Sequence, residues 1–193
     1  MSGASIPSSD DFVIRRWSDI AEKGRLPSAL DAIFFEASGT KSFASEADKQ
    51  TFRQRWLGRY LAHDPEWIYL AFDPDDTLAG YLVGSLDDPA RTSRFSDIGY
   101  FKDFAALTLA YPAHLHVNLA PSFRNLGIGG KLIDTFTDAV TRAGAVGVHV
   151  VTGAVARNLS FYARNGFHEL GRTKSNSIEV VFLGRRLSTV ETA

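Results

Sequence analysis

The spacing of hydrophobic residues divides the chain into predicted strands and predicted helices. Apolar side chains that alternate with polar ones, or that form short runs, are typical of strands. Such patterns predict strands over residues 11–17, 66–72, 78–86, 114–121, 146–151, 168–172 and 177–187. Apolar side chains three or four positions apart predict helices over residues 27–37, from residue 45, from about residue 95, from residue 127 and over residues 156–166.

Polar residues between these patterns predict where elements begin and turn. Ser45 followed by Asp48 resembles a capping box at the start of a helix. The apolar face of that helix is predicted to contain Phe52, Trp56, Tyr60 and Leu61. Residues 73–76, Asp-Pro-Asp-Asp, form a turn signal, so the strands on either side are predicted to pair as an antiparallel hairpin. The long connection 87–112 is typical of a lid or binding loop.

The helix after residue 127 has the clearest apolar stripe in the chain. Its buried side is predicted to contain Leu132, Ile133, Phe136, Ala139, Val140 and Ala143. Gly144 stands at the C′ position, where a left-handed glycine commonly ends a helix. The order of all these elements predicts a mixed α/β sheet, with an antiparallel first half and a parallel βαβ second half.

Composition narrows the class of protein. The chain has 193 residues, 45% of them hydrophobic and 22% charged, which predicts one globular domain over residues 11–187. Residues 1–10 are predicted to be a flexible N-terminus without a targeting segment, and residues 188–193 a C-terminal tail. A net charge of −1 with scattered basic residues predicts no nucleic-acid and no membrane partner. The absence of cysteine excludes disulfides and thiolate chemistry, and it fits a soluble cytoplasmic protein.

Three glycines at the start of one helix, at positions 127, 129 and 130, predict an anion site. The first N–H groups of a helix have no intrahelical acceptor, and its N-terminus carries partial positive charge. Glycine would let a phosphate approach the main chain without meeting a Cβ. A nucleoside-triphosphate loop is not matched, because Gly130-Lys131 is followed by Leu132. A dinucleotide fingerprint is weak, because its third glycine position is also Leu132.

Two motifs in this region resemble the GNAT superfamily of acyl-CoA-dependent N-acetyltransferases. Arg124-x-x-Gly127-x-Gly129, after a strand that ends at Pro121, is similar to the family's pyrophosphate-binding motif. The segment 156–167, ARNLSFYARNGF, resembles the family's N-x-x-F-Y-x-x-x-G-F signature at the usual distance. Segments 81–86, 114–121 and 179–187 further resemble the acetyltransferase-like domain of animal O-GlcNAcases and its free-standing bacterial relatives. The resemblance implies a GNAT-like mixed sheet with helices on both faces.

The resemblance also implies a co-substrate, acetyl-CoA, without a metal. The residues that would bind it are Val117, Leu119, Arg124, Asn125, Leu126, Gly127, Ile128, Gly129, Gly130, Lys131, Asn158 and Phe161. Main-chain N–H groups near Leu119 would polarise the thioester carbonyl. The other partner would be an amine acceptor, either a small molecule or a peptide lysine, and the family also allows a homodimer.

Candidate catalytic residues follow from the same resemblance. Tyr162 matches the tyrosine that commonly protonates the CoA sulfur. His116 and Asn118 lie on one face of their predicted strand because side chains alternate. Asn118 stands where the animal relatives have an aspartate and has no basic group, so either His116 or solvent would accept the amine proton. His149 on the next strand is a second candidate base.

Each assignment has a structural alternative. The glycines could form only a tight turn, Tyr162 could belong to the core, and Arg124 and Lys131 could be ordinary surface charges. Glu36 could hold a cationic acceptor or simply face solvent. The predicted function is N-acetyl transfer to an amine, and the alternative is a non-catalytic acyl-CoA-binding or protein-interaction module.

Overall fold

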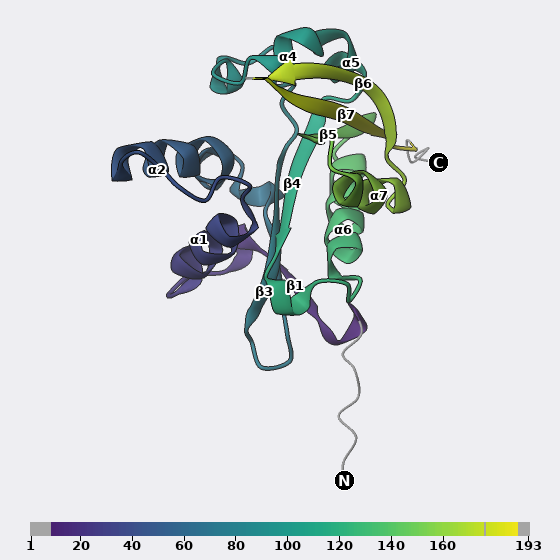
Figure 1. Ribbon diagram of the computed structural model, residues 1–193. Helices are drawn as coiled ribbons and strands as arrows, with labels where there is room; N and C mark the ends of the chain where they lie inside the picture. The colour runs from purple at the N-terminus through teal and green to yellow at the C-terminus, as the bar shows by residue number, and fades with distance from the viewer. Residues whose placement is uncertain (1–8, 176, 189–193) are drawn as a thin grey trace. The chain divides into compact units, whose positions relative to one another are not determined.

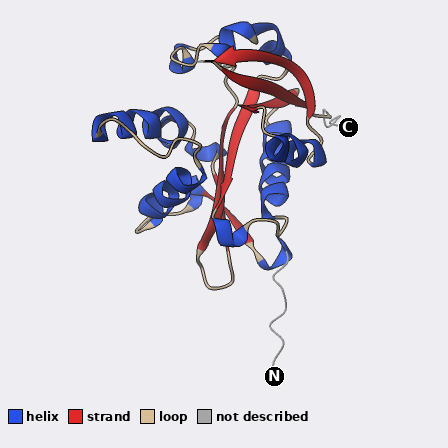
Figure 2. Ribbon diagram, in the orientation of Figure 1, coloured by secondary structure: helices blue, strands red, loops and turns tan. Residues whose placement is uncertain are grey.

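A computed structural model describes residues 9–175 and 177–188 (Figure 2). The strands are β1 (Val13–Arg16), β2 (Tyr69–Phe72), β3 (Leu78–Ser85), β4 (Ala113–Leu119), β5 (Gly147–Gly153), β6 (His168–Ser175) and β7 (Ile178–Arg186). The α-helices are α1 (Leu26–Ala37), α2 (Glu46–Arg53), α3 (Arg59–His63), α4 (Tyr100–Asp103), α5 (Ala105–Ala110), α6 (Ile128–Arg142) and α7 (Ala156–Arg164). Single 3₁₀ turns lie at Ser9–Asp11, Trp17–Asp19, Pro65–Trp67, Ser93–Phe95 and Pro121–Phe123, and a π-helical turn lies at Gln54–Gly58.

The chain forms two compact units that alternate along the sequence. The first contains the described residues up to Val83 together with residues 117–136, and the second contains residues 84–116 and the described residues from 137 onward. The strand order is β1-β2-β3-β4-β5-β7-β6, and β4 contributes residues to both units. The predicted α/β class with a mixed sheet is confirmed. A single domain over residues 11–187 stays a prediction.

The first unit contains the predicted antiparallel strands. Strand β1 pairs antiparallel with β2, and β2 pairs antiparallel with β3, so the predicted hairpin is confirmed. Its turn is closed by the Asp73 carboxylate, which accepts the main-chain N–H groups of Asp75 and Thr77. Strand β4 joins this sheet beside β3, where the N–H of Ala120 donates to the carbonyl of Ala79 at 2.9 Å.

Helices cover both faces of the sheet in the first unit, as predicted. Tyr69 and Leu70 are consecutive on β2 and therefore point to opposite faces. The ring of Tyr69 packs 6.5 Å from that of Phe136 on α6. Tyr81 lies opposite Leu70 on the neighbouring strand. The charges of Asp31 on α1 and Arg53 on α2 act on its hydroxyl, so these helices lie on the Tyr81 side of the sheet. Figure 1 accordingly shows α1 and the start of α6 on opposite sides of β3.

Helix α2 begins as its sequence predicts but does not continue as a regular helix. The Ser45 hydroxyl accepts the N–H of Asp48 at 3.1 Å and donates to its carboxylate at 2.8 Å, which confirms the cap. The following π-helical turn changes the face that the later residues present. Leu57 is therefore fully buried, whereas Trp56, predicted to be on the buried face, is only half-buried.

The second unit contains the parallel pair and a hairpin. Strands β4 and β5 are parallel, with His114 opposite His149. Strand β7 pairs antiparallel with both β5 and β6, so it lies between them. The predicted parallel pairing therefore holds for the strands that flank α6, while the strands that flank α7 do not pair directly. The cause is a tight turn with Ser177 at φ 66°, after which β7 returns beside β6.

Helix α6 confirms most of its predicted stripe. Leu132, Ile133, Phe136 and Val140 are fully buried. Ala143 is exposed, contrary to the prediction, because the helix ends at Arg142. Gly144 then turns the chain with φ 89°, in the left-handed conformation expected at C′. The helix predicted from about residue 95 consists of the short helices α4 and α5.

Candidate cofactor site

The predicted anion site is the loop between β4 and α6, which lies entirely in the first unit. After the 3₁₀ turn Pro121–Phe123, Asn125 has φ 65° and Gly127 has φ 81°. Left-handed residues in such a turn direct main-chain N–H groups into a common concavity that suits an anion. Helix α6 then begins at Ile128. The loop therefore combines a turn of N–H groups with the positive end of a 15-residue helix.

The main-chain N–H groups of this loop have few hydrogen-bond partners among the described residues. Lys131 is the first residue after Arg124 whose main-chain N–H reaches a main-chain acceptor of the described chain, the carbonyl of Gly127 at 3.2 Å. Residues 125–130 thus present consecutive N–H groups without a main-chain acceptor among residues 9–175 and 177–188. Unpaired donors at a helix start are the usual binding groups for phosphate.

Gly127 is needed for a reason that sequence reasoning missed. Its φ of 81° is costly for any residue with a Cβ. A Cβ at this position would also lie 3.2 Å from the Cβ of Ser9. At Gly127 the missing side chain therefore makes room for the N-terminal segment. The close approach of a phosphate to Gly127 stays a prediction.

Lys131 fastens that N-terminal segment to the loop. Its ammonium donates to the carbonyls of Ser9 and Phe12, each at 3.0 Å. The buried ring of Phe12 packs edge-on against Phe123 at 5.8 Å. Ser9 and Asp10 form part of a 3₁₀ turn. Residues 1–8 lie outside the described residues, and the flexibility of residues 1–10 stays a prediction. The Lys131 ammonium has three N–H donors, and two of them already bind the carbonyls of Ser9 and Phe12. Contact between Lys131 and a phosphate stays a prediction.

Arg124 is also held by the protein. Its Nε donates to the carbonyl of Leu119 at 3.1 Å, and its Nη2 pairs with the Glu36 carboxylate at 2.5 Å. Glu36, considered above as a partner for a cationic acceptor, therefore has a cation from its own chain. The pair is partly exposed and contributes on the order of 0–1 kcal/mol. Its main effect is to connect the end of α1 with the end of β4.

Asn118 is oriented by a tyrosine that sequence reasoning did not single out. Its amide nitrogen donates to the hydroxyl of Tyr81 at 2.9 Å. Tyr81 is fully buried, and burial raises the pKa of its phenol, while the hydrogen bond from Asn118 lowers it. The neighbouring Gly80 signals this approach, because a Cβ there would lie 2.2 Å from the Leu119 side chain. Glycine beside tyrosine in a fully buried strand was the available clue.

The second unit carries the other predicted residues on α7. The amide nitrogen of Asn158 donates to the hydroxyl of Thr152 at the end of β5, at 3.1 Å. Tyr162 is buried, and its ring packs edge-on against Phe161 at 5.0 Å and Phe167 at 5.6 Å. Burial raises the pKa of the Tyr162 phenol, so its hydroxyl keeps its proton at neutral pH.

The histidines of β4 and β5 have different surroundings. His116 is half-buried, whereas His114 and His149 are fully enclosed, with their rings 5.4 Å apart. The His149 ring stacks on Phe182 at 4.5 Å, and its Nδ1 lies against the carbonyl of Tyr111. Burial lowers the pKa of His149 to about 3 and that of His114 well below its usual value. His149 is therefore a neutral core residue, a poor candidate for the base.

Two further searches cover the part of the chain that the structure describes. Within it, no three His, Asp or Glu side chains gather as ligands of a metal ion would. Within the same ranges, every helix is too short or too polar to cross a lipid bilayer.

Comparison with known proteins identifies a family and several solved structures with a similar fold. The model of the acetyltransferase (GNAT) family matches residues 30–167. The crystal structure of SsHAT is similar with a TM-score of 0.70 and 21% identity, over 94% of this chain and 100% of that one. A GCN5-related N-acetyltransferase from Kribbella flavida gives 0.65 and 17%, over 93% and 100%. The structure of yncA from Salmonella typhimurium with its cofactor acetyl-CoA gives 0.57 and 14%, over 95% and 97%.

Proposed function

Because the chain belongs to the acetyltransferase (GNAT) family, we propose that it transfers an acetyl group from acetyl-CoA to a primary amine. The observation that carries this proposal is the junction of β4 and α6. There the N–H groups of residues 125–130 lack main-chain acceptors within the described chain, at the positive end of a long helix. A diphosphate is the part of acetyl-CoA that such a group of donors would bind.

The cofactor-binding roles are assigned by the family resemblance together with these contacts. Residues 124–131 would hold the diphosphate through their main chain, and Val117 and Leu119 would offer main-chain groups to the pantetheine arm. Arg124 and Lys131 would support the loop by fixing it to Leu119 and Ser9. Their positive charges would also attract the diphosphate. Asn158 and Phe161 on α7 would contact the same arm.

The proposed reaction is direct attack of the amine on the thioester. The amine nitrogen forms a bond to the carbonyl carbon, the carbon–sulfur bond breaks, and the products are an amide and the free thiol. An amine with a pKa near ~10 must first lose a proton, which His116 or solvent would accept. Tyr162 would donate its proton to the leaving sulfur, a role that its protonated phenol suits.

A non-catalytic acyl-CoA-binding module is the second candidate. It is favoured by Asn118, which lacks a basic group and whose amide nitrogen is bound to Tyr81. In this case the loop would bind the cofactor, but no amine would be acetylated. A cytoplasmic location, a homodimer and the O-GlcNAcase-like subgroup stay predictions of the sequence.

The experiment is calorimetry with acetyl-CoA, followed by release of free thiol in the presence of an amine panel that includes peptide lysines and small amines. We expect saturable heat, and thiol release that depends on the amine. Tyr162→Phe should keep the affinity and lower kcat about 100- to 10,000-fold. Binding without amine-dependent thiol release would support the module, and no heat at millimolar acetyl-CoA would refute both candidates.

A further inference from the structure

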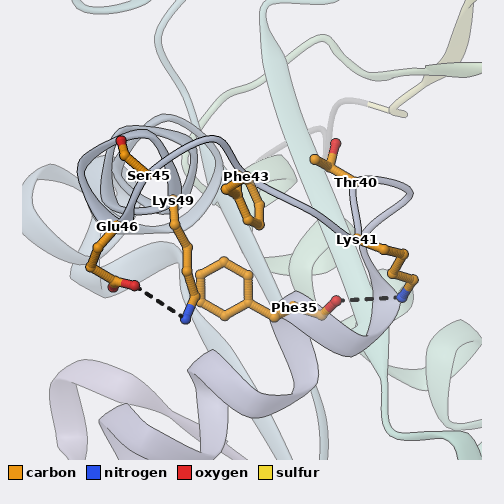
Figure 3. A pocket seen from close by; sticks show the side chains of 7 residues that line it. All are labelled: Phe35, Thr40, Lys41, Phe43, Ser45, Glu46 and Lys49. Atoms are coloured by element: carbon orange, nitrogen blue, oxygen red, sulfur yellow. Dashed lines mark hydrogen bonds and ion pairs between the residues drawn. The ribbon is translucent and has the colours of Figure 1, made fainter.

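Lysines of the first unit bind partners at very different distances along the chain. In the hollow between α1 and α2, the Lys49 ammonium contacts Glu46, three residues away, at 3.7 Å (Figure 3). In the same hollow, the Lys41 ammonium donates to the Phe35 carbonyl, six residues away, at 3.5 Å. Contacts of this span shape a single stretch of chain. The acceptors of Lys131, by contrast, lie 119 and 122 residues away, so this lysine joins two distant segments.

The segment that Lys131 holds is the N-terminal turn, by which we mean residues 9–12. It contains the 3₁₀ turn Ser9–Asp11, and the Phe12 N–H closes it by donating to the Ser9 carbonyl at 3.3 Å. From the first turn of α6, the Lys131 ammonium donates to the carbonyls of Ser9 and Phe12, each at 3.0 Å. Figure 1 shows this purple turn beside the loop that enters α6.

The N-terminal turn contacts the loop between β4 and α6 at three points. Where the loop starts, the Phe12 ring packs edge-on against Phe123 at 5.8 Å and is only 2% exposed. In the middle, the Ser9 Cβ lies 3.2 Å from the position that a Cβ of Gly127 would occupy. Where the loop ends, Lys131 binds two carbonyls of the turn. The N-terminal turn therefore supports the loop at both ends and between them.

The loop depends on such outside contacts because its own main chain makes few. Asn125 and Gly127 are both left-handed, with φ 65° and 81°, a conformation that is unfavourable for a residue with a Cβ. Between the N–H of Arg124, bound to the Pro121 carbonyl at 3.4 Å, and that of Lys131, no N–H has a main-chain acceptor among the described residues. Without support, such a loop would populate several conformations, and ligand affinity falls with the fraction that can bind.

We propose that the N-terminal turn is a positioning element of the cofactor site and that Phe12 is its anchor. The inference rests on the proposed function, because this loop is the one that would hold the diphosphate of acetyl-CoA. With the turn in place, the N–H groups of the loop converge on the diphosphate. With the turn displaced, the loop takes up other conformations and the affinity falls. By thermodynamic linkage, acetyl-CoA stabilises the turn by the same factor by which the turn raises the affinity.

The first arm of the test removes the anchor. Phe12→Ala should weaken acetyl-CoA binding about tenfold in calorimetry, although the Phe12 side chain has no group that binds phosphate. Phe12→Leu keeps a buried apolar side chain and should restore most of the affinity. Phe182→Ala is the matched control, because it removes a fully buried ring from the second unit and should bind as the parent does. Equal affinity of Phe12→Ala and the parent would overturn the proposal.

The second arm asks whether Lys131 acts through the turn or through its own charge. Lys131→Met should also weaken acetyl-CoA binding about tenfold, because it releases both carbonyls of the turn. When it is combined with Phe12→Ala, the total loss should stay at about tenfold, since both changes release the same turn. Independent effects would multiply to about 100-fold, and that result would overturn the proposal.

The third arm uses the parent protein, so it does not depend on the folding of any variant. Saturating acetyl-CoA should slow hydrogen exchange at the Phe12 N–H about tenfold, because the ligand stabilises the turn. The Ile20 N–H is the control and should keep its rate, since it donates to the Trp17 carbonyl at the same 3.3 Å in the next 3₁₀ turn. Unchanged exchange at Phe12, or equal slowing at Ile20, would overturn the proposal and leave the proposed function standing. No binding of acetyl-CoA by the parent would refute both.

Discussion

The two ends of strand β4 carry polar side chains on the same strand face but in opposite surroundings. At its start, His114 is 2% exposed and lies 4.8 Å from the ring of Phe95. At its end, Asn118 is half-exposed, holds the Tyr81 hydroxyl and precedes a loop whose N–H groups lack main-chain acceptors among the described residues. The first end fills a core, and the second lies beside the loop that we propose binds the cofactor.

This difference shows that residue type alone does not assign chemistry. Histidine is the usual general base, yet the enclosed pair His114 and His149 is held neutral by burial. The amide of Asn118 is not basic, yet Asn118 lies beside the loop that the family resemblance assigns to the cofactor. The comparison predicts that changes at the enclosed end alter mainly stability, whereas changes in the loop at the open end alter cofactor binding.

The largest expected effect comes from the ring on which His149 stacks. Phe182→Ala should lower the free energy of unfolding by about 3–5 kcal/mol, because it removes a fully buried ring. Urea denaturation measures this loss, and Ile178→Ala, 64% exposed on the same strand, is the control. Folded Phe182→Ala should still bind acetyl-CoA with the parent affinity. A loss of stability below about 1 kcal/mol would contradict the description of this end as core.

At the open end, Gly127→Val should lower acetyl-CoA affinity about 100-fold, close to 2.7 kcal/mol. Valine strains the backbone at φ 81° and displaces Ser9, so the N–H groups of the loop lose their arrangement. Gly144→Val is the matched control, because Gly144 has φ 89° and nothing within 4 Å of a new Cβ. Both variants should lose similar stability, and only Gly127→Val should lose affinity. If calorimetry gave equal acetyl-CoA affinities for Gly127→Val and Gly144→Val, the loop would not be part of the cofactor site.

The enclosed histidines should make stability depend on pH. Burial holds the pKa of His149 at about 3 when folded, against 6.5 for an ordinary histidine, so the unfolded chain takes up the proton first. The stability is fully present above pH 6.5 and is lost as the pH falls toward 3. One such histidine costs about 2 kcal/mol between pH 8 and pH 5. His149→Leu should remove about 2 kcal/mol of that dependence and leave the share of His114, whose pKa burial also lowers. His168→Leu, exposed on β6, should keep the whole dependence.

Local signals in the sequence predicted much of the fold. Proline ended β4, glycine ended α6 and the Asp73–Asp76 turn closed the hairpin, because each acts on its own few residues. The insertion of β7 between β5 and β6 was not predicted, since alternation fixes which side chains face inward and not which strand is the neighbour. The π-helical turn after α2 likewise leaves no periodic signal.

The candidate site was located by sequence but not explained by it. The motif identified the loop, yet the partners of its two cations came from far along the chain. Lys131 binds a carbonyl 122 residues away, and Arg124 binds a carboxylate 88 residues away. Packing brings such groups together, so neither spacing nor composition reveals them. The same holds for Tyr81, which reaches Asn118 from the neighbouring strand.

The smallest effect should arise from that last contact. Tyr81→Phe removes the acceptor of the Asn118 amide and should lower the free energy of unfolding by about 1 kcal/mol. In a double-mutant cycle with Asn118→Ala, the coupling energy should also be near 1 kcal/mol, because both changes break one bond. Tyr100→Phe, at another buried tyrosine, is the comparison and should show no coupling to Asn118. Zero coupling between Tyr81 and Asn118 would mean that the Tyr81 hydroxyl on β3 does not hold the Asn118 side chain in place. Asn118 would then be held no more firmly than any half-exposed side chain.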